Sequence, residues 1–155
     1  MPQPGAKAPA LLIDAMLGVL ARRLRWLGYD AEYRSDLSDE EMIRIAQQTQ
    51  RVLVTKDRAL ARRRGVRSLY ISATMPEAQV HQVVEAMGPS LHPPRCTVCN
   101  GVLVSITVEE ATSHVPPYIA LTQNKFMRCQ QCGRVYWPGS HWSGLQKWNI
   151  WEDEE

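Results

Sequence analysis

Residues 51–57 read Arg-Val-Leu-Val-Thr-Lys-Asp, and they contain the clearest strand signal in the sequence. The run of Val and Leu is typical of a β-strand. Asp57 follows the strand by two residues, at the end where parallel sheets gather their ligands. The basic residues 58–64 then predict a short helix that Gly65 ends. A buried strand that leads directly into a helix is the building unit of an α/β fold.

The same alternation of short apolar strand and helix continues on both sides of this stretch. The predicted strands are residues 10–13, 31–33, 51–55 and 68–71. The predicted helices are residues 16–27, 38–48, 58–64 and 74–87. Two of these helices begin with a capping box, formed by Ser38 with Glu41 and by Thr74 with Glu77. Strands separated by helices form a parallel sheet through right-handed crossovers, so we expect an α/β layered fold with helices flanking the sheet.

A proline-rich segment, residues 88–94, divides the chain into two unequal parts. Its prolines cannot continue the preceding helix, so we interpret it as a linker or a rigid turn. We expect one domain over residues 8–90, a smaller module over residues 95–145 and an acidic tail over residues 146–155. The second part holds four of the five tryptophans, Trp137, Trp142, Trp148 and Trp151. Their rings suit either a small core or stacking on nucleobases, and the sequence leaves both interpretations open.

The composition is that of a globular protein. Hydrophobic residues make up 45% of the chain and charged residues 22%, which excludes a mainly disordered or fibrous protein. The formal net charge of +2 indicates no particular partner. No apolar run approaches the roughly 20 residues of a membrane-spanning helix, and residues 1–9 do not resemble a secretory signal. We therefore expect a cytoplasmic protein without a membrane partner, and this compartment disfavours disulfides.

The four cysteines form the most specific motif in the sequence. Cys96-x-x-Cys99 and Cys129-x-x-Cys132 are two pairs of the kind that place four thiolates around one Zn²⁺ ion. The separation between the pairs exceeds the usual ~15–20 residues, and a strand over residues 102–108 with a loop after it can fill the difference. Such a closed site is structural, and the metal supplies folding energy to a small β-rich zinc ribbon. Two disulfides, unrelated buried thiols and iron–sulfur ligation are the alternatives.

Acidic residues gather where the predicted strands end. Asp14 directly follows the first strand, Asp57 follows the third, and Asp36, Asp39 and Glu40 follow the second. The carboxyl ends of parallel strands meet at one edge, so these side chains are expected on one rim. A carboxylate cluster suits Mg²⁺ or Mn²⁺, and such an ion can generate the nucleophile for phosphodiester hydrolysis. The alternative for the three residues after the second strand is that they only stabilise the N-terminus of a helix.

Basic residues flank this rim and suit a polyanionic substrate. Arg22 and Arg25 lie on the first helix, and Lys56 and Arg58 bracket Asp57. Lysine and arginine side chains at such positions can hold RNA phosphates. The default alternative for any one of them is a solvated helix face.

Several segments in order along the chain resemble the PIN-type ribonucleases of the mut-seven C-terminal family. The resemblance is carried by residues 12–18, 24–30, 52–58, 95–101, 115–117 and 132–141. It implies a PIN-like α/β domain with an appended zinc ribbon, and metal-dependent cleavage of RNA. It also implies that Asp14 and Asp57 are the first and last acids of the site and that Asp39 is the acid that opens the middle helix. The family usually has a fourth acid, and residues 16–27 contain none, so Asp36 or Glu40 would have to substitute.

These observations together predict a metal-dependent endoribonuclease with water as the nucleophile. Asp14, Asp39 and Asp57 would hold Mg²⁺ or Mn²⁺, while the arginines and Lys56 position the RNA backbone. The zinc ribbon would recruit RNA or a larger ribonucleoprotein such as the ribosome. The main alternative is a non-catalytic RNA- or ribosome-binding adaptor that uses the ribbon. A receiver-like protein that accepts a phosphoryl group on Asp57 is the third interpretation.

Overall fold

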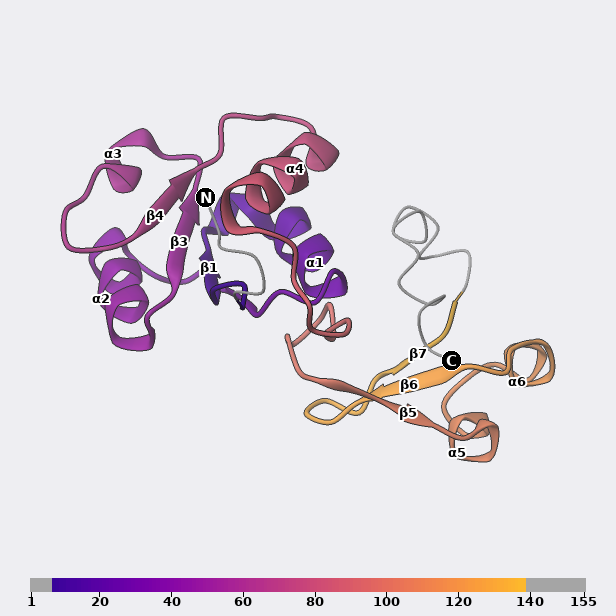
Figure 1. Cartoon of the computed structure of the whole chain (residues 1–155). Helices are drawn as coiled ribbons and strands as arrows, with labels where there is room; N and C mark the ends of the chain where they lie inside the picture. The colour runs from indigo at the N-terminus through magenta and orange to yellow at the C-terminus, as the bar shows by residue number, and fades with distance from the viewer. Residues whose placement is uncertain (1–6, 139–155) are drawn as a thin grey trace.

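A parallel sheet forms the centre of the first part of the molecule (Figure 1). The computed structural model describes residues 7–138. Four strands pair in the order β2-β1-β3-β4: β1 Leu11–Ile13, β2 Ala31–Tyr33, β3 Val52–Thr55 and β4 Ser68–Tyr70. Leu12 at the centre of β1 lies opposite Glu32 on one side and Leu53 on the other. The predicted parallel sheet is therefore confirmed.

Helices cover both faces of this sheet, as Figure 1 shows. They are α1 Gly18–Trp26, α2 Asp39–Thr49, α3 Arg58–Ala61 and α4 Pro76–Met87, and a 3₁₀ turn, η1 Ala15–Leu17, precedes the first. Because side chains alternate along a strand, Leu11 and Ile13 of β1 pack under α1 and α4. Leu12 and Leu53 point the other way, into a second cluster built from α2 and α3. This arrangement explains the unbroken apolar run of β3.

Two predicted helix boundaries are wrong, and tertiary contacts explain both. Thr74 and Glu77 do not form a capping box, because α4 begins after Met75 and that residue makes no side-chain cap bond. Instead, the side chains of Gln79 and Gln82 bind the main chain of Ala73, with donor–acceptor distances of 3.0 and 2.8 Å. The basic helix ends at Ala61 rather than at residue 64. The Ser68 hydroxyl donates to the Ala61 carbonyl over 2.7 Å, which gives that carbonyl a partner outside the helix.

Other local signals are confirmed by the structure. The Ser38 hydroxyl accepts from the Glu41 N–H while the Glu41 carboxylate accepts from the Ser38 N–H, which is a complete capping box. Gly28 has φ of +96°, and a Cβ added there would lie 2.0 Å from the His92 carbonyl oxygen. The proline-rich segment is therefore held against the first domain at this glycine.

The second part is a small antiparallel sheet with a helical insertion. Strands β5 Leu103–Ile106, β6 Phe126–Cys129 and β7 Val135–Tyr136 pair in that order. The strand expected over residues 102–108 ends early, because Thr107 and Glu110 form a capping box that opens α5 Val108–Thr112. A further short helix, α6 Pro117–Thr122, was not expected. A parallel four-stranded sheet is thus followed by a small β-rich sheet, as predicted.

For Trp137, the structure decides between the two interpretations left open by the sequence. Trp137 packs against a cluster that contains Ala111, Ile119 and Phe126, and its ring centroid lies 6.5 Å from that of Phe126. It belongs to a small core. The remaining predictions for this region lie outside the described residues: Trp142, Trp148, Trp151 and the acidic tail over 146–155. Among residues 7–138, no helix is long and apolar enough to cross a membrane.

The two sheets share a hydrophobic contact through α1. Trp26 is fully buried in a cluster with Cys96, Leu103, Met127 and Tyr136, all of which belong to the second part. The Trp26 and Tyr136 ring centroids are 5.5 Å apart. The last turn of α1 therefore completes the core of the ribbon.

Candidate active site and zinc centre

Asp14 and Asp57 are joined by the hydroxyl of Thr55 at the carboxyl edge of the parallel sheet. The Thr55 Oγ1 donates to Asp14 Oδ2 over 2.7 Å and accepts from the Asp57 N–H over 3.0 Å. The two acids end neighbouring strands, because β1 pairs with β3. This geometry brings together two of the predicted site residues that are far apart in sequence.

The turns that follow these strands hold both carboxylates by their backbone. Asp14 Oδ1 accepts from the Ala15 N–H over 2.7 Å. Asp57 Oδ1 accepts from the N–H groups of Ala59 and Leu60 over 2.9 and 3.2 Å, at the start of α3. Both side chains are half-buried. These backbone N–H groups fix the position of each carboxylate.

The other predicted acids lie in the segment that leads into α2 and in the first turn of this helix. Asp39 is the exposed first residue of α2, and this helix starts at the same edge because it follows β2. Asp36 forms an ion pair with Arg34 at 3.2 Å, and hydrogen bonding to that guanidinium lowers the Asp36 pKa. Glu40 pairs with Arg63 at 3.4 Å. Within residues 7–138, the only group of three or more metal-binding side chains whose ligand atoms all lie within 4.8 Å of one another is formed by cysteines.

Three of the predicted RNA-binding cations remain near the rim with exposed or half-exposed side chains. Arg58 Nε donates to the Tyr70 hydroxyl over 3.1 Å, and its guanidinium carbon lies 5.5 Å from the Tyr70 ring centroid. Lys56 Nζ donates to the Ala73 carbonyl over 3.3 Å. Arg22 is exposed on α1.

Arg25 has a structural role that the sequence did not indicate. Its side chain is buried, with Nε donating to the Ala31 carbonyl over 2.8 Å and an Nη donating to the Thr97 carbonyl over 2.8 Å. Burial lowers the pKa of this guanidinium, although the neighbouring Glu32 opposes the shift. Its predicted contact with RNA stays untested, while its contacts tie α1 to the first cysteine pair.

The four cysteines converge on one point, as predicted. All four lie in the described part of the chain and are free thiols, and the Cys96–Cys132 and Cys99–Cys129 sulfur distances are 3.6 and 3.4 Å. Zinc bound tetrahedrally at about 2.3 Å from each sulfur requires sulfurs about 3.8 Å apart. A Cβ on Gly101 would lie 2.6 Å from the Cys129 sulfur, so a glycine leaves room for the sulfurs there. The cluster is consistent with structural zinc.

The pKa values of these thiols shift in opposite directions, and burial raises those of Cys99 and Cys132. Burial raises the pKa of Cys129, but the N–H groups of Cys132 and Gln131 outweigh it and lower the pKa to about 7. The Tyr136 hydroxyl lies 3.0 Å from the Cys96 sulfur, where it can donate to a zinc-bound thiolate. This contact was not predicted from the sequence.

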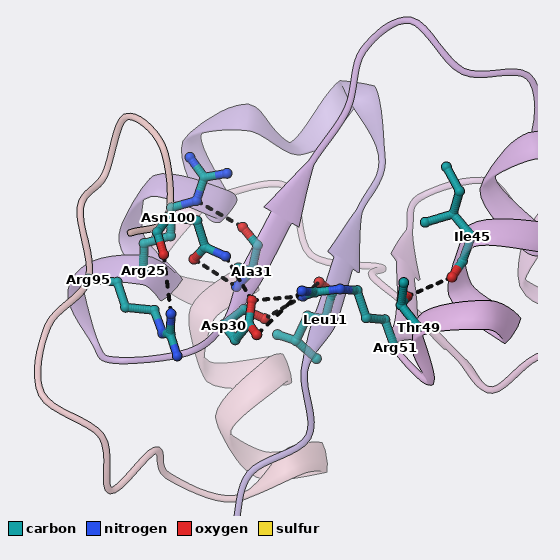
Figure 2. A network of polar contacts seen from close by, with 9 residues as sticks. All are labelled: Leu11, Arg25, Asp30, Ala31, Ile45, Thr49, Arg51, Arg95 and Asn100. Atoms are coloured by element: carbon teal, nitrogen blue, oxygen red, sulfur yellow. Dashed lines mark hydrogen bonds and ion pairs between the residues drawn. The ribbon is translucent and has the colours of Figure 1, made fainter. Parts of the chain in front are cut away.

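A polar network at the start of β2 was also missed by sequence reasoning (Figure 2). Asp30 pairs with Arg51 at 2.8 Å and accepts from the Asn100 amide over 2.7 Å. Burial raises the Asp30 pKa, but these two partners outweigh burial and lower it. The Asn100 Oδ1 accepts from the Ala31 N–H over 3.1 Å. Asn100 has φ of +70°, a conformation that asparagine tolerates better than most residues.

Comparison with known proteins gives one match. The family model described as "Mut7-C RNAse domain" matches residues 9–148, which include both sheets, the Asp14–Asp57 pair and the four cysteines. No curated protein and no solved structure matches the chain.

Proposed function

Since the chain belongs to the Mut7-C RNase domain family, we propose that it is a metal-dependent endoribonuclease that hydrolyses RNA phosphodiesters. RNA is the substrate that the family implies. The observation that supports the metal-dependent mechanism is the link from the Asp14 carboxylate through the Thr55 hydroxyl to the Asp57 main chain, which brings the two acids to the ligand-binding edge of a parallel sheet.

Asp14 and Asp57 would hold the cation, and Asp39 at the start of α2 would contribute from the same edge. A Mg²⁺ or Mn²⁺ ion held by these residues would activate a water nucleophile and neutralise charge on the phosphate. Thr55 orients Asp14 by donating a hydrogen bond to one of its oxygens, and the Ala15 N–H holds the other. The carboxylates are therefore fixed before substrate arrives, which lowers the reorganisation needed in the reaction.

The basic side chains around this edge would bind the RNA backbone. Arg58 is steadied over the Tyr70 ring, so less side-chain entropy is lost when its guanidinium meets a phosphate. Arg22 and Lys56 would add further positive charge for the RNA backbone. The zinc ribbon has a closed set of four sulfurs and would act in recruitment of RNA or of a ribonucleoprotein such as the ribosome.

A non-catalytic RNA-binding adaptor is the second candidate, and one observation favours it. The ligand atoms of Asp14, Asp39 and Asp57 do not all lie within 4.8 Å of one another in the described chain. A protein that had kept the scaffold for binding alone would tolerate such spacing.

A cleavage assay separates the two functions. Zinc-loaded protein, dialysed free of loosely held metal, is incubated with single-stranded RNA with and without added Mg²⁺ or Mn²⁺. We expect endonucleolytic products only when one of these ions is added, and RNA binding in both conditions. Binding without cleavage under every metal condition would support the adaptor and contradict the nuclease.

A further inference from the structure

We propose that a groove between α1 and the first cysteine pair binds unpaired nucleotides that flank the phosphodiester at Asp14. The groove has a volume of about 660 Å³, within the range of about 300–1,000 Å³ that is typical of ligand sites. Its lining comes from η1 and α1, from Thr97 and Val98 of the ribbon, and from Tyr33, Thr74, Pro76 and Gln79 near β2 and α4. This inference rests on the proposed function, since it names a subsite for the same RNA.

The walls present apolar side chains that the fold leaves uncovered. Met16 and Val19 on one wall are 66% and 44% exposed, and Val98 on the facing wall is 55% exposed. Large apolar side chains gathered at the rim of a groove indicate a binding surface. Nucleobases have apolar faces, and proteins that bind unpaired bases hold them between aromatic or apolar side chains.

The groove begins at the turn that follows Asp14. Met16 and Leu17 belong to η1, the turn that Asp14 caps, and the Leu17 N–H donates to the Asp14 carbonyl over 3.0 Å. An RNA strand whose phosphate sits at Asp14 therefore meets this groove within the next nucleotides. Arg22 lines the groove and offers a cation to a phosphate, so the charge suits a polyanion. This combination favours RNA over an apolar peptide.

The groove is preformed by contacts between its walls. Arg25, which lies below it on α1, donates to the Thr97 and Val98 carbonyls over 2.8 and 3.4 Å. The Arg95 N–H donates to the Arg25 carbonyl over 2.8 Å. These bonds fix the distance between α1 and the ribbon, so little conformational entropy is lost when a ligand enters.

The ligand class that fits is single-stranded RNA rather than a duplex. Bases in a duplex are stacked on one another, and their faces cannot contact Val98 or Met16 unless they are unpaired first. The site should tolerate different bases, because apolar contact with a base face carries little sequence information.

Binding of a fluorescent single-stranded oligoribonucleotide tests this subsite. The full-length, zinc-loaded protein carries Asp14→Asn so that cleavage does not interfere, and Val98→Asp or Arg22→Ala is added. We expect Val98→Asp to raise the Kd about tenfold, because it removes a base contact and repels phosphate. Arg22→Ala should weaken binding and lower the slope of log Kd against log salt by about 1.

Matched controls change similar side chains away from the groove. Leu121→Asp alters an exposed apolar residue on α6, and Arg44→Ala alters an exposed arginine on α2. Both should leave the Kd within about twofold. Met16→Ser, on the opposite wall, is the second variant if Val98→Asp loses zinc, and it should also weaken binding.

The outcomes separate this inference from the proposed function. The subsite is overturned if the groove variants bind RNA as tightly as the Asp14→Asn protein does. It is also overturned if the control variants lose as much RNA affinity as the groove variants, or if duplex RNA binds as tightly as single-stranded RNA. A groove that serves a protein partner would give the first of these results. If the unchanged protein, with Asp14 in place, fails to cleave RNA while Val98→Asp weakens binding, the nuclease proposal is wrong and the subsite is still supported.

Discussion

At the scale of single residues, Thr55 is the side chain on which the proposed active site depends. It is fully buried at the end of β3, and its one hydroxyl donates to Asp14 and accepts from the Asp57 N–H. A hydroxyl is the only group of this size that can do both at once. Valine has nearly the same shape and can do neither, so this position allows a clean test.

Thr55→Val should lower the rate of RNA cleavage at least about tenfold, because Asp14 loses the bond that orients it. The free energy of unfolding should fall by about 1–3 kcal/mol, because the Asp57 N–H loses its partner. Thr55→Ser keeps the hydroxyl and should retain most of the activity. Cleavage kinetics and urea denaturation measure the two effects. Equal cleavage rates for the valine and serine variants would show that the link between the acids is not needed.

At the scale of helices and strands, the sequence predicted several features that local chemistry decides. The apolar run of β3 and the capping box of α2 are short-range signals, and both were read correctly. The capping box predicted at Thr74 is wrong. Gln79 and Gln82 bind the main chain of Ala73 instead, and no sequence motif indicates these contacts. The capping box of α5 was present in the sequence, and it was missed because the flanking apolar residues suggested a strand.

Interface residues could not be predicted for a different physical reason. Trp26 and Arg25 fit the pattern of an ordinary amphipathic helix, and nothing in their spacing says that a second sheet covers them. The same holds for Asp30 and Asn100, which bind each other although 70 positions separate them in the sequence. Contacts of this kind are fixed by how two finished elements meet, so only the structure reveals them.

Asn100→Gly tests the contact between the first cysteine pair and β2. Glycine accepts the positive φ of this position but removes the amide that binds Asp30 and the Ala31 N–H. We expect the free energy of unfolding to fall by about 1–3 kcal/mol with zinc content unchanged. Gln50→Gly is the control, because Gln50 has φ of +56° and ends α2 at the surface. Equal effects of the two changes on denaturant unfolding would contradict a role for the amide.

At the scale of the whole molecule, the two sheets are expected to unfold as one unit. Trp26 of α1 lies in the core of the ribbon, and Arg25 binds the carbonyl of Thr97 between the first two cysteines. The proline-rich segment packs closely against Gly28, so it is not a free linker. With zinc bound, the four-cysteine cluster would therefore stabilise the domain that carries the carboxylates, although it lies outside the proposed chemistry.

Removal of zinc should consequently weaken the parallel sheet as well as the ribbon. After chelation, we expect the thermal midpoint to fall by about 10 °C or more, in one transition. Hydrogen exchange read by mass spectrometry should show lost protection in residues 18–33, which belong to the first domain. Unchanged protection of those residues after chelation would show that the two parts fold independently.

In the proposed ribonuclease, Asp14 holds the catalytic cation. This role is tested by comparing Asp14→Asn with the unchanged protein in Mg²⁺- or Mn²⁺-dependent cleavage of single-stranded RNA, with Asp36→Asn as a control for an exposed acid. We expect Asp14→Asn to abolish cleavage while RNA affinity and zinc content are retained, and Asp36→Asn to cleave at a similar rate to the unchanged protein. Cleavage by Asp14→Asn at the unchanged rate would show that Asp14 does not hold the catalytic cation.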